Sequence, residues 1–371
     1  MKKLLVVLLA LAVVGGVFAD VTGYGRVRTD FGVGMDLEAE NESPTWVFGV
    51  SPRIGLKGEK DNVSFWVHAT GTGGLNVSVD NSVITDYITN PGSGSLDGLI
   101  ATDFGFGVEG DATVTLGSAT LSIGKTELPW AQWSSLDFWG DSHYGFGVSA
   151  SKNNPYIQFG IAGLYLGLTD GGYTNEKYLS RTDDSSYGYS AVTPFPGFYV
   201  GYDFASKDTF TAGLAFAGAP RGVIEDEISV FSFMINAHAK LLMLDPITLG
   251  INFAFYNAPQ YGYFALSNSG LLYEGSIKDG AVTNTVIEGL LDIGIGLDPC
   301  NIGLSLGLLT NATSEDDGGN NALGLKIGAC ATFDLGGGFS LIPGVVFENW
   351  SWKDDGKSTN MSFGVSLSYN F

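Results

Sequence analysis

The sequence ends in MSFGVSLSYNF, residues 361–371, where large apolar residues alternate with small or polar ones. A period of two is typical of a β-strand whose two faces meet different surroundings. Chain ends usually fray into solvent, whereas this one stops on an aromatic residue with no polar tail. We therefore expect the last strand to be held inside a sheet. Its apolar positions are Met361, Phe363, Val365, Leu367, Tyr369 and Phe371.

The same alternation recurs along the chain, between clusters of Gly, Pro, Asn and Asp that are typical of turns. The 54 glycines agree with this pattern, because glycine costs about 1 kcal/mol relative to alanine inside a helix. The sequence predicts an all-β fold of about sixteen antiparallel strands. We expect these strands at approximately 22–37, 45–57, 63–79, 99–116, 119–127, 144–151, 156–169, 197–205, 209–219, 228–243, 247–257, 284–297, 301–310, 321–335, 339–352 and 359–371.

The charge balance excludes one large class of function. The formal net charge is −21, with 18 Lys and Arg against 39 Asp and Glu. Nucleic-acid binding needs Lys and Arg clustered against phosphates, so this class is excluded. Only 15% of the residues are charged, which is below the roughly 25% of a typical soluble domain.

Residues 1–19 have the three parts of a secretory signal peptide. Two lysines follow the first methionine, the apolar core LLVVLLALAVV comes next, and VFA at 17–19 forms a small-x-small cleavage site. We expect cleavage after Ala19, which leaves 20–371 as one barrel domain. An uncleaved anchor is the alternative, but the apolar run is short of the roughly 20 residues that a membrane helix needs. Because no later stretch is long enough either, any membrane crossing must be made by strands.

The connections between the predicted strands differ in length according to their place in the chain. Those after even-numbered strands are short, such as GEKDN at 58–62. Those after odd-numbered strands are mostly long, and the longest lie near 80–98, 128–143, 170–196 and 258–283. Short turns at one end and long loops at the other are typical of an outer-membrane barrel, with turns in the periplasm and loops outside. A soluble pair of β-sandwiches, the alternative fold, has no reason to sort its loops in this way.

Each predicted strand has one apolar face and one small, polar face. In IGLSLGL at 302–308, isoleucine and leucine alternate with glycine and serine. In a barrel of this size the apolar face meets lipid and the other face a hydrated interior. An open sheet edge in lipid would leave backbone groups unpaired, so we expect the last strand to pair with the first, near Thr22–Leu37. Aromatic residues near strand ends are interpreted as membrane-interface girdles; they are Trp46, Phe104, Tyr144, Tyr199, Tyr256, Trp350 and Tyr369.

The signal peptide, the sixteen alternating strands, the sorted loops and the terminal Phe371 with Tyr369 together resemble bacterial outer-membrane porins. The resemblance covers the whole mature chain in architecture, and the style of the signal also resembles spirochaete outer-sheath porins. It implies that Tyr369 and Phe371 form the signal that the barrel-assembly machinery recognises. Porins often trimerise, so the resemblance also implies a homotrimer, for which the sequence itself gives no direct sign.

The segment LSIGKTELPWAQWSSLDFWGD at 121–141 is similar to the strand and inward loop of general porins, where the strand ends in Gly-Arg and the loop folds into the pore. Here Gly124-Lys125 leads into a loop that contains Trp133, Asp137 and Asp141. The resemblance implies that loop carboxylates face basic residues of the wall and set up a transverse field at the pore constriction.

Arg26, Arg28 and Arg53 are the candidates for the basic side of this constriction. They lie on two adjacent predicted strands of a chain that is poor in arginine. Because they alternate with the apolar positions of these strands, we expect their side chains to point into the barrel. The alternative is that these arginines pair with neighbouring carboxylates such as Asp30 and only rigidify the wall. Lys125 departs from the pattern, because it shares parity with the lipid-facing positions of its strand; it lies at the rim, or a bulge intervenes.

The sequence therefore predicts a passive, water-filled channel for small hydrophilic solutes and ions, exported to the outer membrane. Its acidic total would raise the local concentration of cations at low salt, which predicts a modest cation preference. One alternative is a substrate-selective channel, for sugars or apolar compounds, whose aromatic loop 128–141 holds the ligand. Another is a surface adhesin or antigen whose long acidic loops bind host partners.

Nothing in the sequence indicates an enzyme, a metal site or a cofactor. Ser142 and His143 are adjacent, so on a strand they would point to opposite faces. The three histidines and two cysteines lack zinc-site spacing, and the acidic clusters at 38–42, 225–227 and 315–317 do not match a calcium loop. Cys300 and Cys330 allow at most one disulfide, and the sequence does not decide whether it forms.

Overall fold

The structure, a computed structural model, describes most of the chain after the predicted signal peptide. The described residues are 20–37, 44–78, 100–126, 154–169, 197–206, 209–224, 228–257, 277–278, 281–282, 285–312, 322–352 and 356–371. The strands within them are β1 (Asp20–Asp36), β2 (Thr45–Lys60), β3 (Val63–Ser78), β4 (Ile100–Leu116), β5 (Ala119–Thr126), β6 (Asn154–Ile161), β7 (Leu164–Thr169), β8 (Gly197–Ser206), β9 (Phe210–Ile224), β10 (Ile228–Leu244), β11 (Ile247–Asn257), β12 (Ile277–Lys278), β13 (Ala281–Val282), β14 (Thr285–Leu297), β15 (Cys300–Ala312), β16 (Ala322–Gly336), β17 (Phe339–Trp352) and β18 (Gly356–Asn370).

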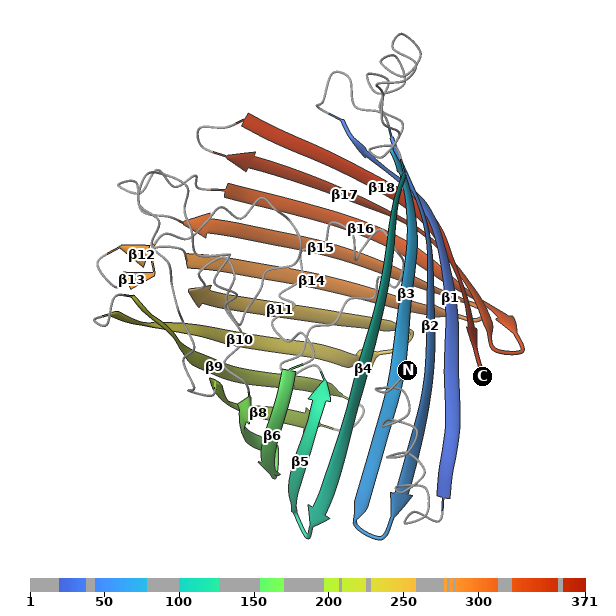
Figure 1. Cartoon of the computed structure of the whole chain (residues 1–371). Helices are drawn as coiled ribbons and strands as arrows, with labels where there is room; N and C mark the ends of the chain where they lie inside the picture. Colours follow the sequence, from blue (N-terminus) through green and yellow to red (C-terminus); the bar gives the residue numbers. More distant parts are fainter. Residues whose placement is uncertain are drawn as a thin grey trace, which may run out of the picture.

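Sixteen of these strands close into one antiparallel barrel in which each strand pairs with its neighbours along the chain (Figure 1). β11 pairs directly with β14, and β12 and β13 form a separate two-stranded sheet. The predicted all-β, up-and-down barrel of about sixteen strands is therefore confirmed. Among the described residues there is no helix that is long and apolar enough to cross a membrane.

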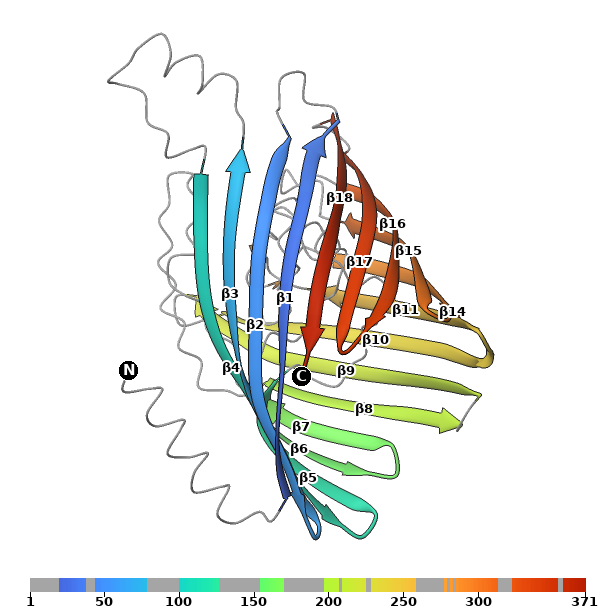
Figure 2. The same ribbon diagram turned by 90° about the vertical axis from the view of Figure 1, so that its right-hand side faces the viewer.

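The barrel closes where the first strand meets the last, and Figure 2 shows β1 beside β18. The two strands pair in continuous register from Arg26 opposite Asn370 to Asp36 opposite Asn360. The final residue is paired as well: the Phe371 N–H donates to the Gly25 oxygen at 3.0 Å, and the Gly25 N–H donates to the Phe371 oxygen at 2.9 Å. The predicted pairing of the chain's end with its beginning is thus confirmed.

The aromatic end of the chain covers this seam from outside. The ring of Phe371 lies over Gly25, where a Cβ would overlap it. Tyr369 stacks between Phe339 and Phe371, at centroid distances of 4.4 and 5.7 Å. Because Gly25 has no side chain, the terminal ring can lie flat against the first strand at the point of closure.

The turns are sorted as predicted. Two residues join β2 to β3, β4 to β5, β6 to β7, β10 to β11, β14 to β15 and β16 to β17, and three join β8 to β9. The long connections follow β3, β5, β7 and β11, at the opposite end of the barrel. One end of the wall is therefore made of tight turns, which is the periplasmic end in barrels of this kind.

One predicted strand is wrong. The strand expected at 156–169 is a hairpin of β6 and β7 that turns at Ala162 and Gly163, whose φ angles are 48° and 86°. Apolar residues face outward at odd positions up to Ile161 and at even positions from Leu164, so the alternation reverses its phase at the turn. The strand expected at 144–151 lies outside the described residues.

The two faces of the wall differ as predicted. On β9, Leu214 is 54% exposed on the outer face, whereas Ala215 beside it is 1% exposed on the inner face. On β11, Ile251 is 53% exposed and Asn252 is 6% exposed. One member of the predicted aromatic girdle is misplaced, because Tyr199 points inward and is buried. The outward side chains next to it on β8, Phe198 and Val200, follow the expected parity.

Candidate pore wall

Polar side chains of next-but-one strands meet across inward-facing glycines. Adjacent strands lie about 4.8 Å apart, so two side chains that flank a middle strand must close a gap of about 10 Å between backbones. The middle residue in each case is glycine, and a Cβ there would overlap one or both partners or the neighbouring backbone. We call these arrangements glycine-bridged pairs. Within the described residues they are Tyr24–His68 over Gly55, Asp111–Tyr156 over Gly124, Gln158–Tyr199 over Gly167 and Asp203–His238 over Gly213.

The first pair extends into a chain of three polar groups. The Tyr24 hydroxyl lies 3.2 Å from His68 Nδ1, and His68 Nε2 lies 3.1 Å from a carboxylate oxygen of Glu109. A carboxylate only accepts hydrogen bonds, so Nε2 carries the proton and Nδ1 of the neutral ring accepts from the tyrosine. The imidazole also stacks on Trp66, at a centroid distance of 4.9 Å and an interplanar angle of 29°. His68 is thus fixed on three sides.

Two further pairs lie on β4 to β8. The hydroxyl of Tyr156 donates to Asp111, and the hydroxyl of Tyr199 donates to the side-chain oxygen of Gln158 at 3.0 Å. Long aromatic side chains are needed here because the partners belong to strands that are not neighbours. Each pair therefore links two strands that are not neighbours across the glycine of the strand between them, in addition to the backbone ladder.

The fourth pair joins β8 and β10. His238 Nε2 lies 3.7 Å from a carboxylate oxygen of Asp203, and both side chains lean over Gly213 on β9. The pairs recur on strands β1 to β10, so this part of the inner wall is covered by polar side chains that contact one another. A buried polar group that lacks a partner is costly, and each glycine-bridged pair supplies such a partner to its own two side chains.

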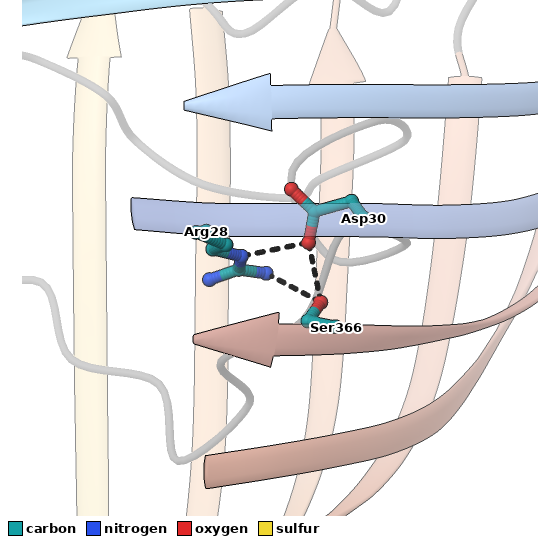
Figure 3. A network of polar contacts seen from close by, with 3 residues as sticks. All are labelled: Arg28, Asp30 and Ser366. Atoms are coloured by element: carbon teal, nitrogen blue, oxygen red, sulfur yellow. Dashed lines mark hydrogen bonds and ion pairs between the residues drawn. The ribbon is translucent and has the colours of Figure 1, made fainter. Parts of the chain in front are cut away.

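A different network lies at the seam (Figure 3). Arg28 Nε donates to Asp30 at 2.7 Å, and another guanidinium nitrogen donates to Ser366 at 3.0 Å. The Ser366 hydroxyl in turn donates to Asp30 at 2.5 Å. The three groups close a ring of contacts between β1 and β18, which locks the register of the closing pair.

The structure places the three predicted arginines together on the inner face. Arg26 stands directly opposite Arg53 across β1 and β2, and Arg28 stands opposite Ser51. Arg28 pairs with Asp30, which is the arrangement that the alternative interpretation expected for it. The loop residues Trp133, Asp137 and Asp141 lie outside the described residues, as do the acidic clusters and the long loops on which an adhesin or antigen would rely. The constriction stays a prediction.

Acidic groups also line the inner wall on β14 and β17. Glu288 and Asp292 on β14 are 4% and 6% exposed on the inner face. Glu348 on β17 stands directly opposite Lys326 on β16, and both are 2% exposed. Glu288, Asp292 and Lys326 stand on the small, polar face of their strands, and the structure places that face inward, as the alternation predicts.

Lys125 lies on the outer face, one residue before the end of β5. It is exposed, and β5 pairs with β4 in continuous register through it. The bulge that the sequence left open is therefore absent from this pair. A lysine on the outer face can extend its long side chain along the apolar surface and keep its ammonium in a polar layer.

The described part of the chain also answers whether the two cysteines are bonded and whether a metal site is present. Cys300 and Cys330 form no disulfide; Cys300 stands opposite Phe333 and Cys330 opposite Gly303, so the two do not face each other. No group of His, Cys, Asp or Glu side chains among the described residues is arranged to hold a metal ion.

Sequence reasoning missed the glycine-bridged pairs and the role of Ser366. Parity alone places Tyr24, His68 and Glu109 on the inner face, but only the strand register shows which of them meet. The one available signal is an inward glycine between two inward polar residues on the flanking strands, and this signal appears only when the strands are aligned.

Comparison with known proteins supports the fold through solved structures. No protein-family model matches the chain, and no curated protein matches its sequence. Among solved structures, the anion-selective porin from Comamonas acidovorans matches with a TM-score of 0.52 and 14% identity, covering 95% of this chain and 99% of that chain. Salmonella typhi OmpF, solved with daunomycin, matches with a TM-score of 0.53 and 13% identity, covering 95% and 97%. Pseudomonas aeruginosa OccK7 matches with 0.50 and 13%, covering 95% and 99%. The chain therefore has the fold of a bacterial outer-membrane porin, a general-porin-like β-barrel.

Proposed function

We propose that this chain is an outer-membrane porin that forms a passive, water-filled channel for small hydrophilic solutes and ions. The observation that carries the proposal is the two-faced wall of a closed barrel. Outward side chains such as Ile54 and Leu214 are apolar and exposed, whereas the inward face carries paired polar and charged groups. Lipid suits only the first face and water only the second. The likeness of the fold to solved porins supports the same conclusion.

Planar-bilayer recording tests the channel directly. The folded mature protein is expected to add current in discrete steps, and liposomes that contain it are expected to swell in small sugars. Protein that inserts into the bilayer but gives neither steps nor swelling would contradict the proposal. Release of the protein from cell envelopes without detergent would contradict the outer-membrane location.

We also propose a modest cation preference and a transverse field across the lumen. Arginines gather on β1 and β2, whereas the carboxylates of Glu288 and Asp292 lie on β14. The net charge of −21 supports the cation preference. A gradient of potassium chloride should give a reversal potential of cation-selective sign that weakens at high salt, because the Debye length falls from about 10 Å at 0.1 M to about 3 Å at 1 M. A chloride-selective potential would overturn this part.

The predicted constriction can be tested on its wall side. Replacing Arg26 and Arg53 together with alanine removes two positive charges that face each other across β1 and β2. If these arginines face loop carboxylates at Asp137 and Asp141, the replacement should increase both the cation preference and the single-channel conductance. An unchanged reversal potential would show that the two arginines lie away from the ion path.

For export and assembly, we propose that residues 1–19 are a cleaved signal peptide and that the barrel-assembly machinery reads Tyr369 and Phe371. The exposure of Phe371 on the outer face, at 59%, supports this role. Deleting Phe371 should lower the amount of inserted barrel without changing the conductance of each inserted barrel. The predicted homotrimer is tested by the mass of the detergent-solubilised protein.

A further inference from the structure

A cavity of about 630 Å³ lies in the inner wall near the turn between β2 and β3, and it is open on one side, because Thr22, Lys57, Glu59 and Ser64 are exposed. Thr22, Lys57 and Trp66 line it from three adjacent strands, in one row of the register. Glu59 and Ser64 form the next row toward the turn and line it too. Its volume lies within the roughly 300–1,000 Å³ of small-molecule sites. This cavity is separate from the arginines at the seam, which stand farther from the turn on the same strands.

The aromatic part of the lining is held in place before any ligand arrives. Tyr24 and Glu109 contact the two nitrogens of His68 at 3.2 and 3.1 Å. Trp66 stacks on that imidazole, so one face of the indole is fixed by a side chain that is itself fixed. The ammonium of Lys57 lies 6.0 Å from the centre of the Tyr24 ring. A site whose side chains are held by their neighbours loses little freedom when a ligand binds.

The side chains of the lining favour a neutral ligand that has both hydrogen-bonding groups and an apolar face. Lys57 and Glu59 carry opposite charges, so a cation or an anion would meet one group of its own sign. The same two groups, with the hydroxyls of Thr22 and Ser64, offer donors and acceptors to a ligand that is rich in hydroxyls. The rings of Trp66 and Tyr24 offer apolar area. A pyranose sugar combines C–H faces with a rim of hydroxyl groups and matches both features.

We propose that this cavity is a binding site for a neutral pyranose sugar at the turn end of the pore, with a C–H face of the ring on Trp66 and hydroxyl groups on Lys57 and Glu59. The proposal deepens the proposed function and rests on it only for the route by which the sugar reaches the site. Because the tight turns mark the periplasmic end, a sugar that enters the cell would meet this site last.

Calorimetry on the detergent-folded mature protein, with glucose as the probe, tests the site. Glucose is expected to give saturable heat, and Trp66→Leu is expected to weaken its affinity by about tenfold or more. Trp46→Leu is the matched control, because Trp46 lies on the outer face and is 42% exposed. Equal losses in the two variants, or no saturable heat with the unaltered protein, would overturn the proposal.

A second pair of variants covers the case in which Trp66→Leu disturbs folding. Lys57→Gln removes the charged donor in the cavity and should also weaken glucose binding, whereas Lys60→Gln, on the other face of the same strand, should not. Glucuronate supplies the charge test: binding about tenfold tighter than that of glucose would overturn the choice of a neutral ligand. Calorimetry does not depend on ion current, so the two proposals can fail separately. A barrel that conducts without binding glucose refutes the sugar site alone. A barrel that binds glucose without conducting refutes the channel alone.

Discussion

Both halves of the inner wall carry polar side chains, but the two halves are built differently. In strands β1–β10, which we call the bridged half, long side chains such as Tyr156 and Tyr199 reach over glycines to partners two strands away. In strands β14–β18, which we call the serine half, the inner face combines the charged groups of β14, β16 and β17 with short hydroxyls. The hydroxyls belong to Ser305, Ser362, Ser366 and Ser368, each of which is 5% exposed or less.

The comparison shows that a polar lining can depend strongly on the register between neighbouring strands or be nearly independent of it. A glycine-bridged pair needs three residues on three strands to be aligned, so a change at the glycine breaks a contact between two other residues. A buried serine depends mainly on its own hydroxyl. The bridged half should therefore be sensitive to added volume, whereas the serine half should tolerate the loss of a hydroxyl.

The largest effect is expected from Gly167→Val in the bridged half. The new side chain would overlap the Tyr199 ring and break its hydrogen bond to Gln158. Overpacking costs about 1–3 kcal/mol and the lost hydrogen bond about 1 kcal/mol, so the free energy of unfolding should fall by about 2–4 kcal/mol. Urea unfolding in detergent measures this change.

Gly107→Val is the matched control for that prediction. Gly107 also faces inward on the bridged half, but a Cβ there would have no heavy atom within 4 Å. It should change the free energy of unfolding by less than about 1 kcal/mol. Similar losses at Gly107 and Gly167 would show that the bridging side chains are irrelevant and that any added volume disturbs the wall.

A smaller effect is expected at the seam, where the two halves meet. Asp30→Ala leaves the Arg28 guanidinium without its carboxylate and removes the acceptor of the Ser366 hydroxyl. Hydrogen bonds to charged groups contribute about 1.5–3 kcal/mol each in net stability, and we expect a loss in that range. A double-mutant cycle of Asp30→Ala with Ser366→Ala should show a coupling above about 0.5 kcal/mol; strict additivity would mean that the ring of contacts does not act as a unit.

The smallest effect is expected from Ser362→Ala in the serine half. The Ser362 hydroxyl is fully buried and has no hydrogen-bond partner within the described structure, so removing it deletes a desolvated group. The free energy of unfolding should stay within about 0.5 kcal/mol of the starting value or rise. Ser366→Ala, four residues along the same face, should instead lose about 1.5–3 kcal/mol, because the Ser366 hydroxyl bonds the charged groups of Arg28 and Asp30. A large loss at Ser362 would indicate a contact that the described residues do not contain.

The sequence predicts the closed barrel well because lipid allows few alternatives. The alternation of apolar and polar residues determines which face of each strand meets lipid, and the sorted loop lengths indicate the direction of each strand. A sheet edge with unpaired backbone groups is too costly in lipid, so the barrel must close. The pairing of Phe371 with the first strand follows from these constraints alone. At 156–169 apolar alternation alone does not reveal the turn, which is marked only by the reversal of its phase between Ile161 and Leu164.

The candidate site was less predictable for a physical reason. Parity places Arg26 and Arg53 on the inner face, but their direct opposition depends on a register that no local pattern fixes. The residue type of Tyr199 favours the outer girdle, but its position between the apolar residues Phe198 and Val200, which face outward, places it on the inner face. The cavity at Lys57 and Trp66 also needs three aligned strands, so only the structure brings its lining together.

The central claim, that the inward face lines the path of water and ions, is tested most directly on two adjacent residues of β4. In a variant with Cys300 and Cys330 replaced by serine, Gly107→Cys places a thiol on the inner face and Phe106→Cys places one on the outer face, where Phe106 is 68% exposed. A water-soluble, negatively charged methanethiosulfonate should reduce the single-channel conductance of Gly107→Cys and leave that of Phe106→Cys unchanged. Reduction only in Phe106→Cys, or no reduction in either variant, would contradict the account.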